Sequence, residues 1–590
     1  MLRRKVLGAF LMYAFLVPGL TLGQTNGVGS AAPVPAARIY SAPAEVIDKI
    51  KDEGTKNSQV MQTLSYLSDV IGPRLTASPG MKRANEWTRD RLTSFGLQNA
   101  HLEAWGPFGR GWTLKRFYAM VDGPTAFPMI AYPKAWSPGT DTLLPPPPPA
   151  DPKAKKSKTP APPPANPSTS FTGEVVHFTA ATEAELDQYK GKLKGKIVLV
   201  GQLRDVRAHF EAEGKRANEK ELLDLADAPD PASIRRPAGP GGPGGNPNFL
   251  LIQQFNNRRM RFLSEEGAAI LMDAGRGDGG TVFVQQAAAV QPPPPAAGAP
   301  ATPNVRLYDK GANIPIQVSA AAEHFNRVAR MVDAGEKVTM TVDLAVEYQD
   351  QDLNGYNTVA EIPGSDLKDE IVMLGGHLDS WQSGTGATDN GAGCAVMMEA
   401  VRILQVAGLK PRRTIRIALW TGEEQGLLGS RAYVKQHFGY FGDGTTPAFG
   451  GGGQNQSSLP LTKLPEYDKL SSYFNIDNGT GKVRGVYMQG NDNVRSIFRN
   501  WLSPFKEMGA NTLTLSNTGG TDHLSFDAIG LPGFQFIQDE IEYSARTHHS
   551  NMDVFDRIQG DDMKQMSIIL AAFVYQTAMM DEKMPRKVAR

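Results

Sequence analysis

The sequence predicts an α/β fold: a mostly parallel, doubly wound sheet with an inserted β-rich region. Two observations lead to this prediction. From about residue 356 onward, short apolar runs of strand character alternate with segments of helical periodicity. Polar, ligand-type residues follow the carboxyl ends of several apolar runs, which is where open α/β sheets place their sites.

The alternating part, residues 351–590, is expected to form the main domain. Its strands are expected at 371–376, 414–420, 472–476 and 533–537, where apolar, β-branched and aromatic residues cluster. Its helices are expected at 391–407, 427–437, 493–502 and about 561–580. The glycine-rich stretch 439–458 falls between two ligand-bearing segments, and the sequence leaves open a mobile loop near the cleft or a simple surface insertion.

Residues 24–115 are expected to be a helical part of this domain, with helices at 47–56, 58–71 and 81–95. Residues 116–350 are expected to form the insert, with strands near 173–178, 196–201 and 268–275 and a short helix at 184–189. Three proline-rich tracts, at 145–167, 229–247 and 292–303, cannot form helices or central strands. We expect them to be exposed loops.

The amino terminus has the pattern of an export signal over residues 1–23. Arg3, Arg4 and Lys5 precede an apolar run that ends near the small residue Gly23. An uncleaved anchor is the alternative, but the run is shorter than the ~20 residues that span a bilayer and contains Pro18. The expected location is therefore periplasmic or extracellular, with no stable membrane insertion after cleavage.

Composition gives information on nucleic-acid binding and on disulfide bonds. The net charge of +1 gives no electrostatic case for binding nucleic acid. The single cysteine, Cys394, excludes an intrachain disulfide and lies on the apolar stripe of a predicted helix, where it is expected to pack in the core.

Five short segments together predict a site for two metal ions. Four of them follow an apolar run, so their side chains are expected to converge on one edge of the sheet. Histidine and carboxylate are the ligands that zinc accepts, and adjacent glutamates offer one ligand and one proton acceptor. The segments are GGHLDSW with His377 and Asp379, ATDNGAG with Asp389, WTGEEQG with Glu423 and Glu424, FNIDNGTG with Asp477, and THHSNMD with His548 and His549.

In this order, these segments resemble the co-catalytic zinc exopeptidase family of leucyl aminopeptidase and glutamate carboxypeptidase. GGHLDSW, GATDNGAG and LWTGEEQG are most similar to the carboxypeptidase Q branch. The LKGKIVLVG segment at 193–201 resembles a protease-associated domain, a β-rich insert whose usual role is to shape the substrate cleft.

The resemblance implies a role for each of these side chains. One zinc ion would be held by His377 and Asp477 and the other by Glu424 and His549, with Asp389 bridging both. Asp379 would accept a hydrogen bond from the second ring nitrogen of His377 and fix its tautomer. Glu423 would be the general base, which agrees with the opposite orientation of neighbouring side chains on an extended segment.

The expected activity is hydrolysis of the terminal bond of short peptides or dipeptides by an exported enzyme with two Zn²⁺ ions. Whether the enzyme reads a free amine or a free carboxylate stays open, as does a homodimer. His523 resembles the aminopeptidase branch, Asp522 could neutralise an α-amine, Arg546 could bind a carboxylate, and His548 is a further pocket candidate. A metal-free receptor and a one-zinc glutaminyl cyclase are rivals that the complete ligand set disfavours.

Overall fold

The computed structural model describes residues 38–145, 169–233, 247–295, 298, 300, 302–444 and 459–587. Several features of the sequence lie outside these residues. They are the expected export signal with its cleavage site, Arg235 and Arg236 of the second proline-rich tract, the glycine run at 450–453 and most of the proline tracts. Within the described ranges, no helix combines the length and the apolar character needed to cross a membrane.

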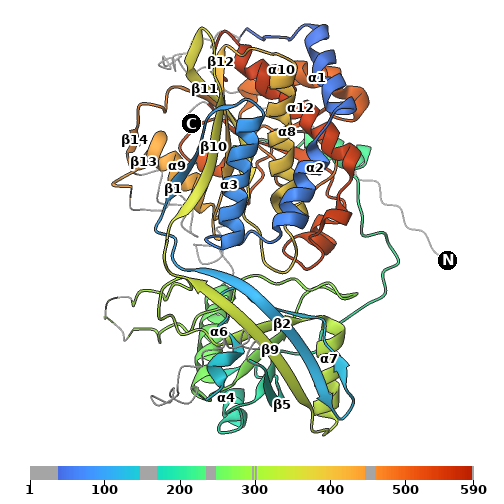
Figure 1. Cartoon of the computed structure of the whole chain (residues 1–590), viewed down its shortest axis with the longest axis vertical. Coiled ribbons are helices and arrows are strands. Elements are labelled where there is room, and N and C mark those ends of the chain that lie inside the picture. The colour runs from blue at the N-terminus through green and yellow to red at the C-terminus, as the bar shows by residue number, and fades with distance from the viewer. Residues whose placement is uncertain are drawn as a thin grey trace, which may run out of the picture. The chain divides into compact units, whose positions relative to one another are not determined.

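The main sheet has eight strands in the order β1-β10-β12-β11-β15-β18-β16-β17. Figure 1 labels the first four strands of this order, which lie side by side. Its centre is the parallel set β12 (Arg413–Trp420), β11 (Leu367–His377), β15 (Leu470–Asn475) and β18 (Gly533–Gln538). These are the four strands expected from the sequence, and the predicted α/β class is confirmed.

The edges of the main sheet are less parallel than the sequence predicts. β10 (Gly355–Ile362) pairs antiparallel with both β12 and β1 (Gln98–Trp105), and β16 (Val483–Tyr487) pairs antiparallel with β18. β17 (Thr512–Thr514) then pairs parallel with β16. The prediction therefore holds for the buried centre of the sheet, and the complete sheet is mixed.

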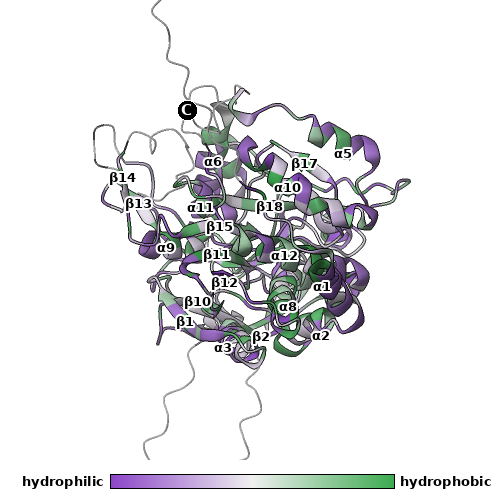
Figure 2. Ribbon diagram, turned by 90° about the horizontal axis from the view of Figure 1, so that it is seen from above, coloured by the Kyte–Doolittle hydropathy of each residue, from purple (hydrophilic) through white to green (hydrophobic). Residues whose placement is uncertain are grey.

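Helices cover both faces of the main sheet. α8 (Ala392–Val406) and α12 (Gly560–Met579) lie on one face, and α9 (Leu428–His437) and α11 (His523–Asp527) lie on the other (Figure 2). α8 and α12 are buried along almost their entire length, because α1 (Ala44–Lys56) and α2 (Val60–Ser65) pack over them. α3 (Pro79–Ser94) covers β1 and β10, and α10 (Arg495–Leu502) completes the expected set.

A second eight-stranded sheet is built from residues between β1 and β10, in the order β3-β2-β9-β5-β6-β7-β8-β4. β5 (Phe171–Phe178), β6 (Ile197–Val200) and β7 (Ile270–Ala274) are the three strands expected there, and they run parallel from β5 to β7. The long strands β2 (Gly111–Gly123) and β9 (Thr339–Gln349) form an antiparallel ribbon, and β3 (Phe127–Pro128), β8 (Ile316–Ala320) and β4 (Ala131–Pro133) complete the sheet.

Two helices of this region differ from expectation. α6 (Pro247–Glu265) begins at the last proline of the second tract, and α7 (Ala322–Asp333) follows β8. A proline at the first helical position costs little, because its missing N–H would have no helical partner there. The proline tract therefore ends where a helix starts.

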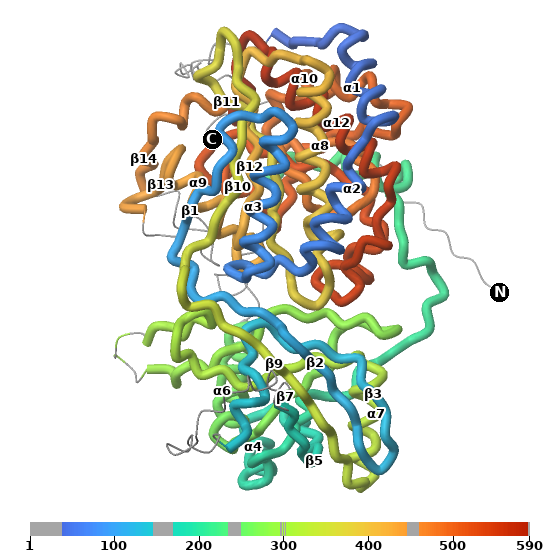
Figure 3. Tube along the Cα trace, in the orientation of Figure 1, coloured from blue at the N-terminus to red at the C-terminus, as the bar shows by residue number. Residues whose placement is uncertain are grey.

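The chain enters and leaves the second sheet at neighbouring points of the main sheet, which can be followed in Figure 3. β1 leads into β2, β9 leads back into β10, and the last residue of β1, Trp105, is paired with the first residue of β10, Gly355. A further connection follows β6, where Lys215 pairs with Ile541 and α5 (Glu219–Ala226) begins.

Candidate metal centre

The ends of the parallel strands bring the predicted ligand segments to one edge of the main sheet. β11 ends at His377, and the segments with Glu424, Asp477 and His549 follow β12, β15 and β18. Asp389 lies in the turn that leads into α8. Five side chains from five segments of the sequence thus lie together because parallel strands share the direction of their carboxyl ends.

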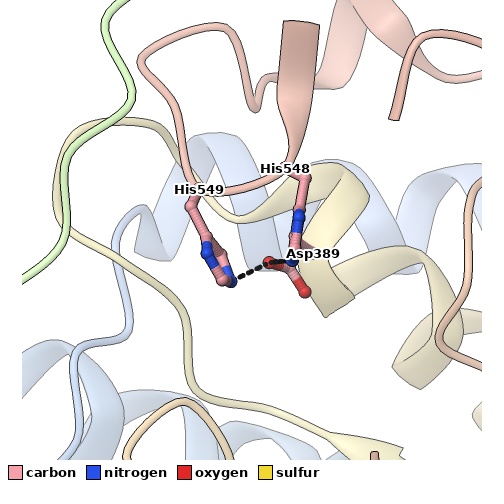
Figure 4. Close-up of side chains that lie close together, drawn as sticks. All are labelled: Asp389, His548 and His549. Carbon is pink, nitrogen blue, oxygen red and sulfur yellow. Dashed lines mark ion pairs between the residues drawn. The ribbon is translucent and has the colours of Figure 1, made fainter. Parts of the chain in front are cut away.

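Asp389 lies between two histidines. Its Oδ1 atom is 3.2 Å from Nε2 of His377. Its Oδ2 atom is 3.2 Å from Nε2 of His549, and Figure 4 shows these two side chains facing each other. Asp477 approaches Nε2 of His377 to 3.4 Å, and Glu424 approaches Nε2 of His549 to 2.9 Å. The predicted set therefore forms two groups that share one carboxylate, which is the arrangement that a pair of metal ions requires.

The donor atoms of this cluster fit a metal. Four buried ligand-type atoms have no hydrogen-bond partner among the described residues: Nε2 of His377, Oδ2 of Asp389, Oε1 of Glu424 and Oδ1 of Asp477. Buried polar atoms without partners are costly, and ligand atoms facing a common space lose that cost when a cation binds. A mixed set of imidazole and carboxylate ligands suits zinc.

The electrostatics of the cluster point the same way. Burial and the charge of Asp389 raise the pKa of Glu424 to about 8. Burial would lower the pKa of His549, but Glu424 and Asp389 outweigh it and raise this pKa to about 10. The protein alone thus holds a buried excess of negative charge, which protons or cations must neutralise.

Glu423 lies beside the two groups without joining either pair of ligands. Its Oε2 atom is 3.9 Å from Nε2 of His377, and its side chain is almost fully buried. Burial raises its pKa well above the ordinary value, and the neighbouring carboxylates Asp477 and Asp522 add to that rise. A buried carboxyl group whose affinity for protons is raised in this way is a candidate general base.

Asp379 has a different role from the one expected. Nδ1 of His377 is 3.0 Å from the backbone carbonyl of Asp379, whereas its carboxylate lies 3.7 Å away, beyond hydrogen-bond distance. That carboxylate instead accepts the backbone N–H groups of Glu423 and Glu424, at 3.2 and 3.3 Å, and the hydroxyl of Thr76 at 3.0 Å. Asp379 therefore fixes the backbone that carries both glutamates.

Both histidines of the last segment face Asp389. Nε2 of His548 is 3.7 Å from Oδ2 of Asp389, slightly farther than Nε2 of His549. The ring of His548 stacks on Tyr543 with centroids 4.6 Å apart, while His549 alone also contacts Glu424. The distances favour His549 as the ligand and leave His548 beside it.

Two residues proposed for substrate recognition are buried. Asp522 and His523 have no exposed surface, and neither lines the pockets beside the cluster. His523 contacts Gln489 and the carbonyl of Thr518, and burial lowers its pKa to about 4. This burial contradicts direct contact of either residue with a substrate terminus.

Arg546 is already paired. Its guanidinium contacts Glu213 and donates to the carbonyl of Asp278 at 3.0 Å and to the hydroxyl of Thr281 at 2.8 Å. These three partners belong to the region of the second sheet. Arg546 therefore joins that region to the segment of His549. These contacts compete with the expected binding of a substrate carboxylate, which stays a prediction.

Sequence reasoning missed one buried cation that shapes the site. Arg74 is fully buried and donates to the carbonyls of Leu378, Thr385 and Gly386 at 2.7–2.8 Å. These carbonyls belong to the loop between His377 and Asp389. Because all the acceptors are backbone atoms, no pattern of side chains in the sequence could identify this arginine.

Two pockets share His548 and His549. One, of about 450 Å³, contains the cluster, because Asp389, Glu424 and Asp477 line it together with Glu423. The other, of about 600 Å³, is lined mainly by the second-sheet region, with Lys134, Arg276 and Phe283 among its residues. A ligand spanning the cluster would thus meet the main domain on one side and the inserted region on the other.

The chain is similar to known peptidases. Residues 357–574 match the family model "Peptidase family M28". Carboxypeptidase Q of Mus musculus is 31% identical over 265 residues, which are 45% of this chain and 50% of the relative. The chain thus spans about half the length of this relative. Carboxypeptidase Q of Bos taurus is 25% identical over 93% of this chain and 91% of its own length.

The fold has a counterpart among solved structures. The crystal structure of a peptidase M28 precursor from Shewanella amazonensis matches with a TM-score of 0.58 and 20% identity, over 92% of this chain and 99% of that chain. The part of the chain that carries the cluster, residues 357–574, thus resembles peptidases of family M28. Over nearly its whole length, the chain is similar to carboxypeptidase Q of Bos taurus.

Proposed function

We propose that this protein is an exported zinc metallo-exopeptidase that hydrolyses the terminal bond of short peptides or dipeptides, as carboxypeptidase Q-like enzymes do. The position of Asp389 between His377 and His549 is the main support. Two zinc ions per chain would be held by His377 with Asp477 and by Glu424 with His549, and Asp389 would touch both.

The residues of the chain divide the chemistry. When bound, the zinc pair would supply Lewis-acid activation of water and of the scissile carbonyl. Glu423 would accept the proton of the attacking water and return it to the leaving amine. Asp379 would keep Glu423 in place through its backbone N–H, which Asp379 already accepts.

The region from 116 to 350 is proposed to be a protease-associated-like insert that shapes the substrate cleft. Its contribution of Lys134, Arg276 and Phe283 to the larger pocket supports this role. Aminopeptidase activity is the alternative within the same family. The two activities differ in the substrate terminus that the pockets must bind: a free amine for an aminopeptidase and a free carboxylate for a carboxypeptidase. A metal-free receptor or a one-zinc cyclase would not need all five ligands of the cluster.

Metal analysis combined with peptidase assays tests the proposal. The chelated full-length protein should lose hydrolysis of dipeptides, and added zinc should restore it at two zinc ions per chain. The substrate panel should contain dipeptides with a free amine, a blocked amine, a free carboxylate and a blocked carboxylate. A zinc-loaded protein that cleaves none of these peptides would refute the proposal.

Export is tested separately. Expression of the full chain, cell fractionation and sequencing of the mature amino terminus should find the protein outside the cytoplasm and shortened near residue 23. A full-length amino terminus in the membrane fraction would instead support the anchor alternative.

A further inference from the structure

We propose that His209, Glu213 and Asp278 form a further metal site, outside the catalytic cluster, which binds a single Zn²⁺ ion. The three side chains come from two segments that are far apart in the sequence. The connection after β6 carries His209 and Glu213, and the turn after β7 carries Asp278. This inference goes beyond the proposed function, because it requires no peptide substrate and none of the ligands of the cluster.

The three side chains lie close enough together to hold one ion. Nδ1 of His209 is 3.1 Å from Oε1 of Glu213, and Nε2 of His209 is 2.7 Å from Oδ2 of Asp278. Each residue offers one ligand atom such that all three atoms lie within 4.8 Å of one another. Two ligand atoms on one zinc ion are at most about 4.2 Å apart, so the side chains need to move by less than about 1 Å to bind it.

The mixture of ligand types favours zinc over a hard cation. One imidazole and two carboxylates give three protein ligands, and these are ligand types that zinc accepts. All three side chains are partly exposed, so water can complete a four-coordinate site. Calcium and magnesium select oxygen ligands, and the histidine would take no part in binding them.

Such an arrangement is rare in this protein. Among the described residues, three groups of histidine and carboxylate side chains come close enough to hold an ion, and two of these groups belong to the catalytic cluster. The remaining group is the one proposed here. An exposed histidine elsewhere, His101, lies 3.8 Å from the carboxylate of Glu103 and belongs to none of these groups. The distance requirement that finds the catalytic ligands therefore also finds His209, Glu213 and Asp278.

Arg546 holds the two carboxylates through other atoms. Its guanidinium contacts Oε2 of Glu213, donates to the backbone carbonyl of Asp278 at 3.0 Å and lies 3.8 Å from Oδ1 of Asp278. The oxygens that face His209 are Oε1 of Glu213 and Oδ2 of Asp278. Carboxylates that bind metals are themselves hydrogen-bonded, which fixes their orientation. Arg546 therefore orients the two carboxylates and leaves the oxygens that face His209 to the ion.

An ion at this position would join two parts of the inserted region next to the catalytic domain. The connection that carries His209 continues to Lys215, which pairs with Ile541 of the main domain. The turn that carries Asp278 begins with Gly275 and Arg276, which line the 600 Å³ pocket. Zinc would thus hold the connection to the turn that forms one edge of this pocket.

Zinc analysis of the full-length protein tests the site. The wild type, His209→Ala, Asp278→Asn and the control His101→Ala should be dialysed against a series of buffered free zinc concentrations. His209→Ala and Asp278→Asn should bind one zinc ion fewer per chain than the other two proteins. The affinity for this ion should fall by more than about 10- to 100-fold, the loss that removal of even an outer-shell partner causes. Equal zinc binding by all four proteins would overturn the inference.

Proteolysis gives a second measurement. The side chain of Arg207, two residues before His209, is 84% exposed and open to trypsin. Added zinc should slow cleavage after Arg207 in the wild type, because the ion fixes the connection, and should leave the rate unchanged in His209→Ala. Equal slowing in both proteins would place the effect of zinc elsewhere and overturn the site.

The two proposals can fail separately. A protein that cleaves no peptide but loses one zinc ion through His209→Ala would refute the proposed function and support this site. An active peptidase whose zinc content is the same in the wild type and His209→Ala would refute this site and leave the proposed function standing.

Discussion

The indole N–H of Trp381 donates a hydrogen bond to Glu424, with Nε1 and Oε2 2.7 Å apart. The same carboxylate oxygen faces Nε2 of His549 at 2.9 Å, and the other oxygen, Oε1, has no hydrogen-bond partner among the described residues. Trp381 thus orients Glu424 so that Oε1 can bind a metal ion. Glu423, its neighbour, lies on the His377 side of the cluster.

Substitution of the two glutamates should separate their roles. Glu423→Gln removes a proton acceptor and keeps the shape, so zinc content should stay near that of the wild type while kcat falls by about 10²–10⁴. Glu424→Gln weakens a ligand, so zinc occupancy should fall and excess zinc should restore part of the activity. Metal analysis and kinetics on both proteins decide this; loss of zinc from Glu423→Gln alone would reverse the assignment.

Loss of Arg546 should affect substrates with either terminal charge alike. Arg546→Ala breaks the contacts with Glu213, Asp278 and Thr281, which join the second-sheet region to the segment of His549. We therefore expect kcat/KM to fall by a similar factor for a dipeptide acid and its amide. A loss confined to the acid would show that Arg546 binds the carboxylate after all.

Arg74 should be important for stability. Its guanidinium donates to five backbone carbonyls, and its side chain is fully buried. Arg74→Ala leaves these acceptors without a partner, and we expect it to lower the free energy of unfolding by about 3–5 kcal/mol. Urea denaturation of both proteins measures the difference. Arg83→Ala, which removes a single exposed bond to the carbonyl of Val70, should change it by less than about 1 kcal/mol.

The pair of His437 and Glu466 should make stability depend on pH. Burial alone would lower the pKa of His437, but hydrogen bonds to Glu103 and Glu466 raise it from 6.5 to about 9. A raised histidine pKa stabilises the folded state fully below pH 6.5, and this contribution is lost as pH rises through about 9. Arg416, which also contacts Glu466, keeps its charge throughout this range.

Thermal melts of the wild type and His437→Gln measure this contribution. The difference in Tm should be largest near pH 6 and should disappear above about pH 9.5. A difference that grows with pH would contradict the assignment.

The centre of the fold could be predicted because each central strand is an apolar run followed by ligand residues. Ile371, Val372 and Leu374 of β11 are fully or almost fully buried, as their hydrophobicity indicates. The edge strands could not be predicted in the same way. β1 has the sequence QNAHLEAW, which contains no apolar run, and most of its residues are exposed or half-buried. Edge strands such as β1 gain their structure from pairing with a neighbour and not from burial.

The candidate site divides along similar lines. Ligand-type residues carry their chemistry in the side chain. The motifs and their spacing were therefore sufficient to predict that His377, Asp389 and Asp477 lie in one site. The pairing state of an arginine is not written in its neighbours. Arg546 lies three residues before His549 in the sequence, but in the structure it forms an ion pair with Glu213.

The pairing of Trp105 with Gly355 has a consequence for how this protein can change over evolution. The chain leaves and rejoins the main sheet at partners on adjacent antiparallel strands, so the intervening sequence closes a gap of only about 5 Å whatever its length. Doubling such a closed loop costs only about 0.6 kcal/mol of chain entropy. Sequence between these two residues can therefore be lengthened, shortened or exchanged while the catalytic edge keeps its register, so substrate preference can diverge without redesign of the chemistry.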